Sequence, residues 1–150
     1  MIRDRREQDL DRLCEILAAR DADDGVLAGR SPRAWLSQID AEVSWVFDQA
    51  PVSVAPTRNV VGHLQVYRPP VEAAWTGEAA TAAGVDVAGL LVIGRMFVKP
   101  MKHDHGVARY LLTEAVKLVK GRGSVAVLDP DGAALVPVAL ARRLGLSDGR

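Results

Sequence analysis

The sequence predicts an α/β or α+β fold in a single domain that spans residues 1–150. Two observations support this prediction. Apolar residues recur at helical spacing in some segments and fill short strand-like runs in others, and the two kinds of segment are interleaved along the chain. In the second half, the strongest strand pattern is followed by a polar turn, a long amphipathic helix, a second buried strand and a weaker helix.

The composition is that of a soluble globular chain, and it excludes several functions. Lys plus Arg and Asp plus Glu each number 19, which leaves no basic footprint for nucleic acid or an anionic membrane. The single cysteine, Cys14, excludes an internal disulfide framework and a cysteine-based zinc cluster. No apolar run approaches the ~20 residues of a membrane span, and the charged N-terminus does not resemble a secretory signal. We therefore expect a cytoplasmic protein without nucleic-acid or membrane partners.

The first third of the chain predicts two helices between two short strands. Ser31 precedes Pro32 in the arrangement of a helix N-cap followed by proline at the first helical position. Strand-type residues then fill "VSWVFD". The expected elements are a strand over 1–4, a helix over 7–19, a helix over 32–42 and a strand over 43–48.

The middle of the chain predicts two further strands and a connection. Residues 59–69 alternate after Gly62, which predicts a half-buried strand with His63, Gln65 and Tyr67 on one side. Residues 70–88 lack clean periodicity, and we expect them to form a long connection. Residues 89–100 are apolar on both faces and end at a proline, which is typical of a fully buried strand.

Gly94 interrupts that strand and predicts a β-bulge or a close backbone approach. Beyond the turn, Val107, Leu111, Ala115 and Val119 fall on one helical face, which "KGRGS" ends. The remaining expected elements are a short buried strand over 124–129 and a weaker helix in "AALVPVALARRLGL".

The turn "KPMKHDHGVA" between the strong strand and its helix has the features of an anion site. Gly106 and Ala108 are small, so a ligand can approach the backbone closely. The first N–H groups of a helix have no internal partners, and with the helix dipole they form a site for phosphate or pyrophosphate. Lys102 and Arg109 flank the turn and add positive charge.

In order and spacing this segment resembles motif A of the GNAT superfamily of acyl-CoA N-acyltransferases, Q/R-x-x-G-x-G/A after a strand that often ends in V-x-P. Val98-Lys99-Pro100 matches the strand end, and residues 103–108 occupy the motif. The resemblance implies a mixed, mostly antiparallel central sheet flanked by helices, with splayed central strands. It also implies acetyl-CoA as co-substrate, without a metal, and a small-molecule or peptide amine as acceptor.

Carried over by position, the resemblance also assigns contacts with CoA. Strand residues would lie along the pantetheine arm and the thioester, and the turn and first helical residues would hold the pyrophosphate. The strand residues are Met96, Phe97 and Val98. The turn and helix residues are His103, Asp104, His105, Gly106, Val107, Ala108 and Arg109.

The chain departs from the family pattern in three places. His103 replaces the usual Gln or Arg, and Ala141 occupies the position of a tyrosine that commonly protonates the departing thiolate. The sequence stops at Arg150, where the family usually adds one or two strands, so we expect a shortened C-terminus or a homodimer that completes the sheet edge. A catalytically impaired CoA-binding or interaction module of the same fold is therefore the alternative to an N-acetyltransferase.

The sequence offers two catalytic residues and argues against a metal. A neutral His63 could accept the proton of the amine, although a solvated strand histidine is the competing interpretation, and Tyr67 or Tyr110 could replace the missing acid. His103 and His105 flank Asp104, but a metal site needs a third ligand and His63 is the only other histidine. We expect no metal.

Overall fold

The computed structural model describes residues 1–49, 59–130 and 138–146. These residues form one mixed sheet of five strands, in the spatial order β1-β2-β3-β4-β5. The first three strand pairs are antiparallel, and only β4 and β5 run parallel. The strands are β1 (Ile2–Asp4), β2 (Val43–Asp48), β3 (Val60–Tyr67), β4 (Leu90–Val98) and β5 (Val125–Leu128). The predicted mixed, mostly antiparallel sheet is confirmed.

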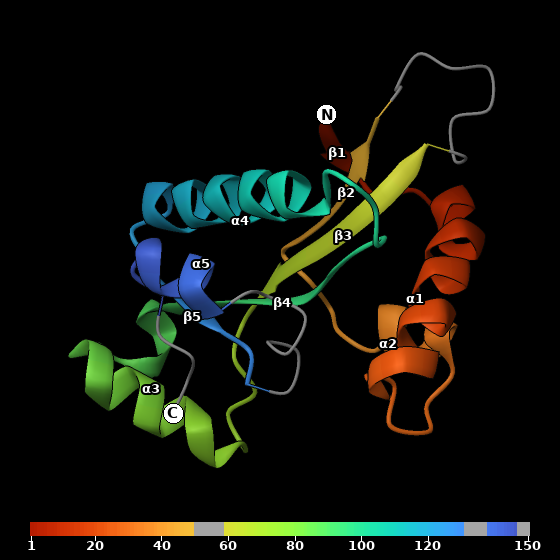
Figure 1. The fold of residues 1–150 in the computed structure, drawn as a ribbon. Coiled ribbons are helices and arrows are strands. Elements are labelled where there is room, and N and C mark those ends of the chain that lie inside the picture. Colours follow the sequence, from red (N-terminus) through yellow and green to blue (C-terminus); the bar gives the residue numbers. More distant parts are fainter. Residues whose placement is uncertain (50–58, 131–137, 147–150) are drawn as a thin grey trace.

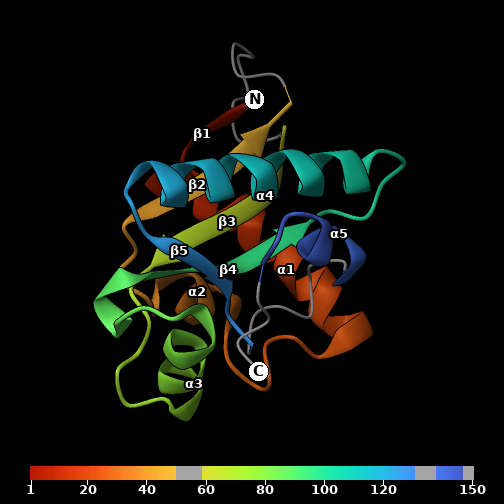
Figure 2. The same ribbon diagram turned by 90° about the vertical axis from the view of Figure 1, so that its left-hand side faces the viewer.

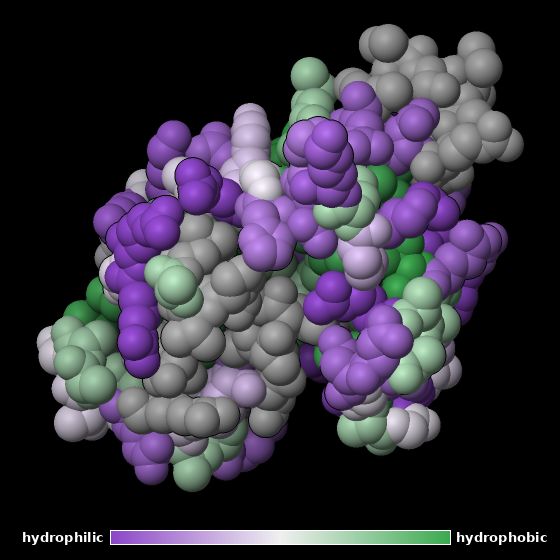
Figure 3. All heavy atoms as spheres, in the orientation of Figure 1, coloured by the Kyte–Doolittle hydropathy of each residue, from purple (hydrophilic) through white to green (hydrophobic). Residues whose placement is uncertain are grey.

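Helices cover both faces of this sheet. Helix α4 lies across one face, and α1 and α2 lie on the other, so that α4 passes in front of the strands and α1 behind them in Figure 2. Hydrophilic residues dominate the outer sides of α4 and α1 in the view of Figure 3. The helices are α1 (Leu10–Asp24), α2 (Pro32–Ser37), α3 (Ala74–Ala83), α4 (Asp104–Gly121) and α5 (Val138–Arg143), with 3-10 turns η1 (Glu7–Asp9) and η2 (Val87–Gly89). Among the described helices none combines the length and apolar character needed to cross a bilayer.

The helix predictions for the first half were correct in kind but not in extent. Helix α1 continues five residues past the predicted end at 19 and stops at Asp24, where Gly25 adopts a left-handed φ of 66°. The predicted cap of α2 is present, since Ser31 Oγ accepts a hydrogen bond from the Ala34 amide at 3.1 Å. That helix nevertheless ends at Ser37 rather than at 42.

Two predictions for the middle of the chain were wrong. Residues 70–88 are not a plain connection, because they contain α3 and η2. Alanine has the highest helix propensity and needs no strong apolar stripe, so this alanine-rich segment folds without a clear periodic signal. Strand β3 is not half-buried, because all eight of its residues are buried. Helices pack on both of its faces, which alternation along one strand does not reveal.

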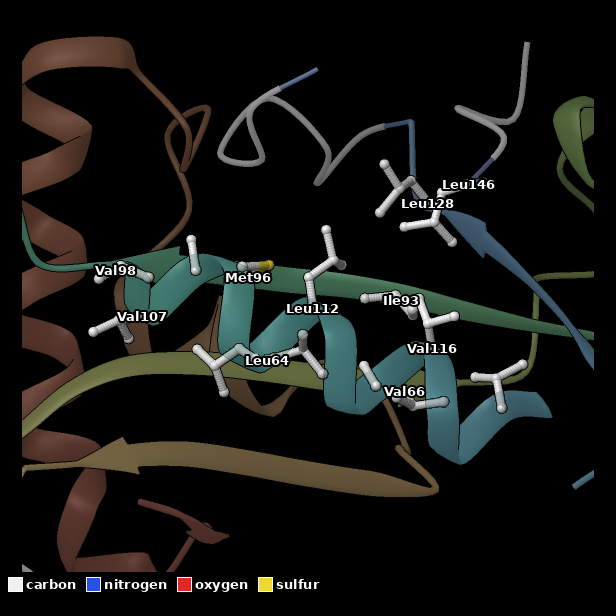
Figure 4. Close-up of a cluster of buried hydrophobic side chains, with 14 of the residues drawn as sticks. Leu64, Val66, Ile93, Met96, Val98, Val107, Leu112, Val116, Leu128 and Leu146 are labelled. Carbon is white, nitrogen blue, oxygen red and sulfur yellow. The ribbon is translucent and has the colours of Figure 1, made fainter. Parts of the chain in front are cut away.

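The α4 face of the sheet holds an apolar core (Figure 4). Helix α4 directs Val107, Leu112 and Val116 onto β3 and β4, where Leu64 and Met96 lie beneath them. Leu64, Met96 and Leu112 have no exposed surface. This core fixes the start of α4 against the end of β4, because Val107 and Val98 belong to the same cluster.

Strands β4 and β5 separate halfway along β4. Their pairing runs from Leu90 opposite Val125 to Ile93 opposite Leu128, and the Asp129 amide donates to the Ile93 carbonyl at 3.0 Å. Beyond Ile93 no strand of the described residues pairs with this edge of β4, which continues to Val98. The predicted splay of the central strands therefore lies between β4 and β5.

Candidate functional site

The turn before α4 carries free backbone donors. Helix α4 begins at Asp104 with His103 as its N-cap, and its first internal bond runs from the Val107 amide to the His103 carbonyl at 3.2 Å. Within the described part of the chain, the amides of Lys102, His103 and Gly106 have no hydrogen-bond acceptor. A Cβ placed on Gly106 meets nothing within 4 Å, so the space in front of this residue is open. These are features that an anion site at a helix N-terminus requires.

The carboxylate of Asp104 occupies part of the same turn. It accepts a hydrogen bond from the His105 amide at 2.8 Å and a longer one from the Met101 amide at 3.4 Å. Asp104 therefore uses two backbone donors of the turn and places negative charge beside the others. His105 is exposed, with 88% of its side-chain surface accessible.

The free edge of β4 leads from this turn to the middle of the sheet. The Lys99 amide donates to the Val61 carbonyl at 2.7 Å, so at this residue β4 faces β3. Since N–H and C=O groups face alternate neighbours along a strand, those of Val98 face the opposite edge, where β5 has separated. An extended ligand could therefore add backbone hydrogen bonds along this edge.

A β-bulge lies where the strands separate. The register of β3 and β4 pairs His63 with Phe97 but Gln65 with Gly94, so β4 contains one extra residue. Arg95 at the bulge has a φ of 49°, in the left-handed region that non-glycine residues rarely adopt. Ile93 and Met96 both face α4, and Gly94 and Arg95 both turn to the other face of the sheet, as their contacts below show. The bulge predicted at Gly94 is confirmed.

Gly94 provides room for a pair of polar side chains. A Cβ on Gly94 would overlap the Tyr67 hydroxyl and lie 3.0 Å from the Asp129 Cβ, so only glycine fits here. The Tyr67 hydroxyl donates to the carboxylate of Asp129, which follows β5. Tyr67 and Asp129 are 2% and 6% exposed. A tyrosine and a carboxylate therefore meet directly over the bulge, between two separating strands.

Arg95 reaches α2 on the same face. Its Nε donates to the Trp35 carbonyl at 3.2 Å, its Nη2 donates to Gln38 Oε1 at 3.0 Å, and its Cζ lies 4.7 Å from the Trp35 ring centroid. Gln38 Oε1 also accepts from Arg30 Nη1 at 3.0 Å. Two guanidinium groups thus converge on one neutral oxygen.

These groups line one open cleft of about 610 Å³, a volume typical of small-molecule sites. Its buried polar residues come from β3, β4 and the end of β5, and its walls come from the α1–α2 connection, the segment after α2 and the segment after β3. The lining residues are Val26, Ala28, Arg30, Gln38, Ile39, Asp40, Tyr67, Arg68, Pro70, Glu72, Arg95 and Asp129.

The structure places His63 in the protein interior rather than in this cleft. His63 is fully buried, and its ring stacks on Phe97 with centroids 5.4 Å apart. Arg5 Nη1 lies 3.0 Å from Nε2 and can only donate, so Nε2 accepts and Nδ1 donates to the Arg95 carbonyl at 2.7 Å. Burial lowers the pKa of His63 to about 3, and the charges of Arg5 and Arg95 act in the same direction against that carbonyl bond. With both ring nitrogens occupied, His63 supports the bulge, and the geometry does not favour its predicted role as a base.

The predicted residues therefore separate into two groups. The turn residues and the strand residues Met96, Phe97 and Val98 adjoin one another as expected, but Met96 and Phe97 have no exposed surface, so only their backbone is suited to a ligand. Tyr67 lies in the cleft, and Tyr110 lies on α4, against Phe47 of β2. No group of three potential metal-ligand side chains occurs among the described residues.

Sequence reasoning missed Asp129, Arg95, Gln38 and Arg30. Two of them carried a signal: Arg95 is the single charged residue in an otherwise apolar strand, and Asp129 comes directly after a short buried strand. Gln38 and Arg30 carried none, because their positions depend on the tertiary arrangement of α2.

The fold is similar to those of two solved acetyltransferase structures. A GNAT family acetyltransferase from Brucella melitensis, solved in complex with acetyl-CoA, has a TM-score of 0.58 and 20% identity, over 97% of this chain and 80% of its own. A protein assigned as a phosphinothricin N-acetyltransferase has a TM-score of 0.51 and 16% identity, over 84% of this chain and 70% of its own. No family model and no curated protein matches the sequence. The chain therefore has a GNAT-like fold, as its turn predicted.

Proposed function

We propose that the protein is an N-acyltransferase that moves an acetyl group from acetyl-CoA to a primary amine. The observation that carries this proposal is the open edge of β4. It runs from the free amides at the start of α4 to the Tyr67–Asp129 pair at the bulge. Binding and proton-transfer groups are thus arranged along one strand, in a fold shared with acetyltransferases.

The residues present fit CoA. The amides of Lys102, His103 and Gly106 would hold the pyrophosphate, with Lys102 and Arg109 adding charge, and the β4 edge near Val98 would pair with the pantetheine arm. When bound, acetyl-CoA supplies an activated acetyl group as a thioester. Backbone amides near the bulge would orient the thioester and polarise its carbonyl oxygen.

The Tyr67–Asp129 pair supplies proton transfer. In the net reaction the amine nitrogen bonds to the acetyl carbon, the carbon–sulfur bond breaks, and one proton passes from nitrogen to sulfur. Asp129 would accept the proton of the amine and Tyr67 would donate its own to the sulfur. The hydrogen bond between them then returns a proton from Asp129 to Tyr67. Tyr67 thus fills the role that the family gives to a tyrosine where this chain has Ala141.

Calorimetry with acetyl-CoA and desulfo-CoA tests binding, and thiol release with a panel of amines tests turnover. We expect both ligands to bind. Gly106→Glu should abolish binding because its carboxylate would enter the open space before the turn, whereas Gly106→Ala should retain it. Unchanged affinity in Gly106→Glu would show that the pyrophosphate lies elsewhere, and no binding by the wild type would refute the proposal.

Turnover is tested at the Tyr67–Asp129 pair. Tyr67→Phe and Asp129→Asn should each lower kcat by roughly 10²-fold or more, the usual contribution of a positioned acid or base, with desulfo-CoA affinity retained. The effects should not add, because the two groups act through one hydrogen bond. Binding without thiol release on any amine would instead favour the CoA-binding module.

A further inference from the structure

We propose that the cleft beside the β4 bulge is the acceptor site, and that the acceptor is a small zwitterion, a primary amine that also carries a carboxylate. This inference rests on the proposed acyl transfer and narrows its substrate class from amines in general to free amino acids and compounds of like charge. A lysine side chain in a protein lacks the second group and would be a poor acceptor.

The carboxylate end is assigned to Arg30 and Arg95. Both donate to Gln38 Oε1, each at 3.0 Å, so their guanidinium groups face the same point. An amide oxygen can accept two hydrogen bonds, but it is neutral and does not offset the charge of Arg30. Within the described residues Arg30 makes no ion pair, and its Nε donates to the Leu27 carbonyl at 3.1 Å. A carboxylate offers two oxygens and a full negative charge, the group that a guanidinium fork binds most strongly.

Two residues that line the cleft have strained backbone conformations. Among the described residues the two non-glycine residues with positive φ are Ala28 and Arg95, at 50° and 49°, and both line this cleft. Strained backbone persists where the surroundings enforce it, and such residues cluster at binding sites. The Trp35 carbonyl and ring fix the Arg95 side chain from the other side. The guanidinium is therefore positioned before a ligand arrives.

The amine end is assigned to Asp129 and Tyr67. Gly94 and Arg95 are consecutive and face the same side of the sheet. The Tyr67–Asp129 pair, which packs over Gly94, therefore lies in the same cleft as Arg95. The buried carboxylate attracts the ammonium form of the acceptor. The ammonium loses one proton to solvent to give the neutral amine, and Asp129 accepts the second proton when the amine attacks, as proposed above. A molecule with an amine and a carboxylate matches both ends at once.

The remaining charges of the cleft lie at its rim. Arg68 is paired with Glu42 at 3.3 Å, and 59% of its side-chain surface is accessible. Asp40 and Glu72 are exposed, and so are Arg30 and Gln38. Solvent screens such groups, so the buried residues Arg95, Tyr67 and Asp129 provide the main recognition, and Arg30 adds to the carboxylate end.

Acceptor preference tests the inference. Thiol release is measured with a set of L-amino acids and with ω-amino acids of different length, and each acid is compared with its primary amide and with the amine left by decarboxylation. We expect kcat/KM for the best acid to exceed that of its amide by roughly 10- to 100-fold, the worth of hydrogen bonds to a charged group. Amides, plain amines or lysine peptides accepted as well as the acids would overturn the inference while leaving the acyl transfer intact.

Variants locate the preference. Arg30→Gln should reduce the acid-to-amide ratio to a few-fold, and Arg30→Lys should restore part of it. The matched control is Arg33→Gln, because Arg33 lies on α2 but pairs outward with Asp11 at 2.8 Å and does not line the cleft. An acid-to-amide ratio that Arg30→Gln leaves unchanged would overturn the assignment of the carboxylate end.

Binding without acetyl-CoA separates the two proposals. Saturation-transfer NMR or calorimetry with the best acid and its amide should show binding of the acid alone, weakened about 10-fold or more by Arg30→Gln. Failure of acetyl-CoA to bind refutes the acyl transfer but leaves this measurement valid. Equal binding of acid and amide refutes the zwitterion on its own.

Discussion

On the face of the sheet that α4 covers, the buried side chains of β3 and β4 are apolar, and they interlock with a helix whose stripe matches them. On the opposite face the same two strands bury four polar residues. His63 bonds to the Arg95 carbonyl, Gln65 to Ser44 Oγ of β2, Tyr67 to the Asp129 carboxylate, and Arg95 to the Trp35 carbonyl of α2. The α4 face is apolar throughout, whereas the other face combines two apolar clusters with polar groups that lie beside an open strand edge. The bulge directs two consecutive residues, Gly94 and Arg95, to the polar face. Strand β4 therefore contributes both to the apolar core under α4 and to the polar cleft.

Gly94→Ala should have the largest combined effect on activity and stability, because it disturbs both the packing of the strand and the Tyr67–Asp129 pair. The new Cβ would displace the Tyr67 ring and break its bond to Asp129. We expect a loss of about 1–3 kcal/mol from overpacking and a fall in kcat of roughly 10²-fold. Thermal unfolding and thiol release measure the two effects. Gly77→Ala is the control, since its Cβ meets nothing within 4 Å. Full activity in Gly94→Ala would exclude the pair from catalysis.

Leu112→Ala tests the apolar face alone. Leu112 is fully buried between α4 and the sheet, and its truncation should cost about 2–5 kcal/mol in the free energy of unfolding. Urea denaturation measures that cost, and Lys120→Ala on the exposed side of α4 should change it by less than about 0.5 kcal/mol. The folded fraction of Leu112→Ala should retain the acceptor preference. A change in that preference would mean that the two faces are coupled.

Sequence patterns predicted the apolar face well, because its side chains recur at regular intervals along each strand and helix. Periods of two and 3.6 residues report which side chains face a core, so β2, β4 and α4 were found nearly at their observed limits. The glycine within β4 predicted the bulge, and the turn at Gly106 predicted the fold. Local signals were sufficient wherever one element faces one apolar layer.

The polar face escaped prediction because its residues depend on partners far apart in the chain. Asp129 meets Tyr67 across 62 positions, and Arg95 meets Gln38 across 57. The alternation of residues correctly placed His63 and Tyr67 on one side of β3 but predicted that this side is exposed to solvent. The local sequence contains no sign that α1, α2 and α3 cover it. A charged residue in an apolar strand was the available clue.

The pH dependence of stability tests His63 as a structural residue of the polar face. Above pH 6.5 the ring is neutral in both states. Below it the unfolded chain gains a proton that the folded chain refuses down to a pKa of about 3, so stability falls through this window. We expect roughly 2–3 kcal/mol to be lost between pH 7.5 and pH 4.5. His63→Gln should flatten the curve in denaturant titrations, and His105→Gln, an exposed control, should not. Equal slopes in all three proteins would contradict the buried neutral ring.

Asp104→Asn should give the smallest effect and sharpen the description of the turn. The asparagine oxygen can still accept from the His105 and Met101 amides, so stability should change by less than about 1 kcal/mol. Removal of a negative charge beside the free amides should tighten desulfo-CoA binding by about 3- to 10-fold at low salt. The gain should shrink at 0.5 M salt, where the Debye length falls below about 5 Å, whereas Asp104→Glu should show no gain. Unchanged affinity of Asp104→Asn in calorimetry would mean that the pyrophosphate lies outside the reach of this carboxylate, and that the free edge of β4, rather than the turn, provides most of the binding energy.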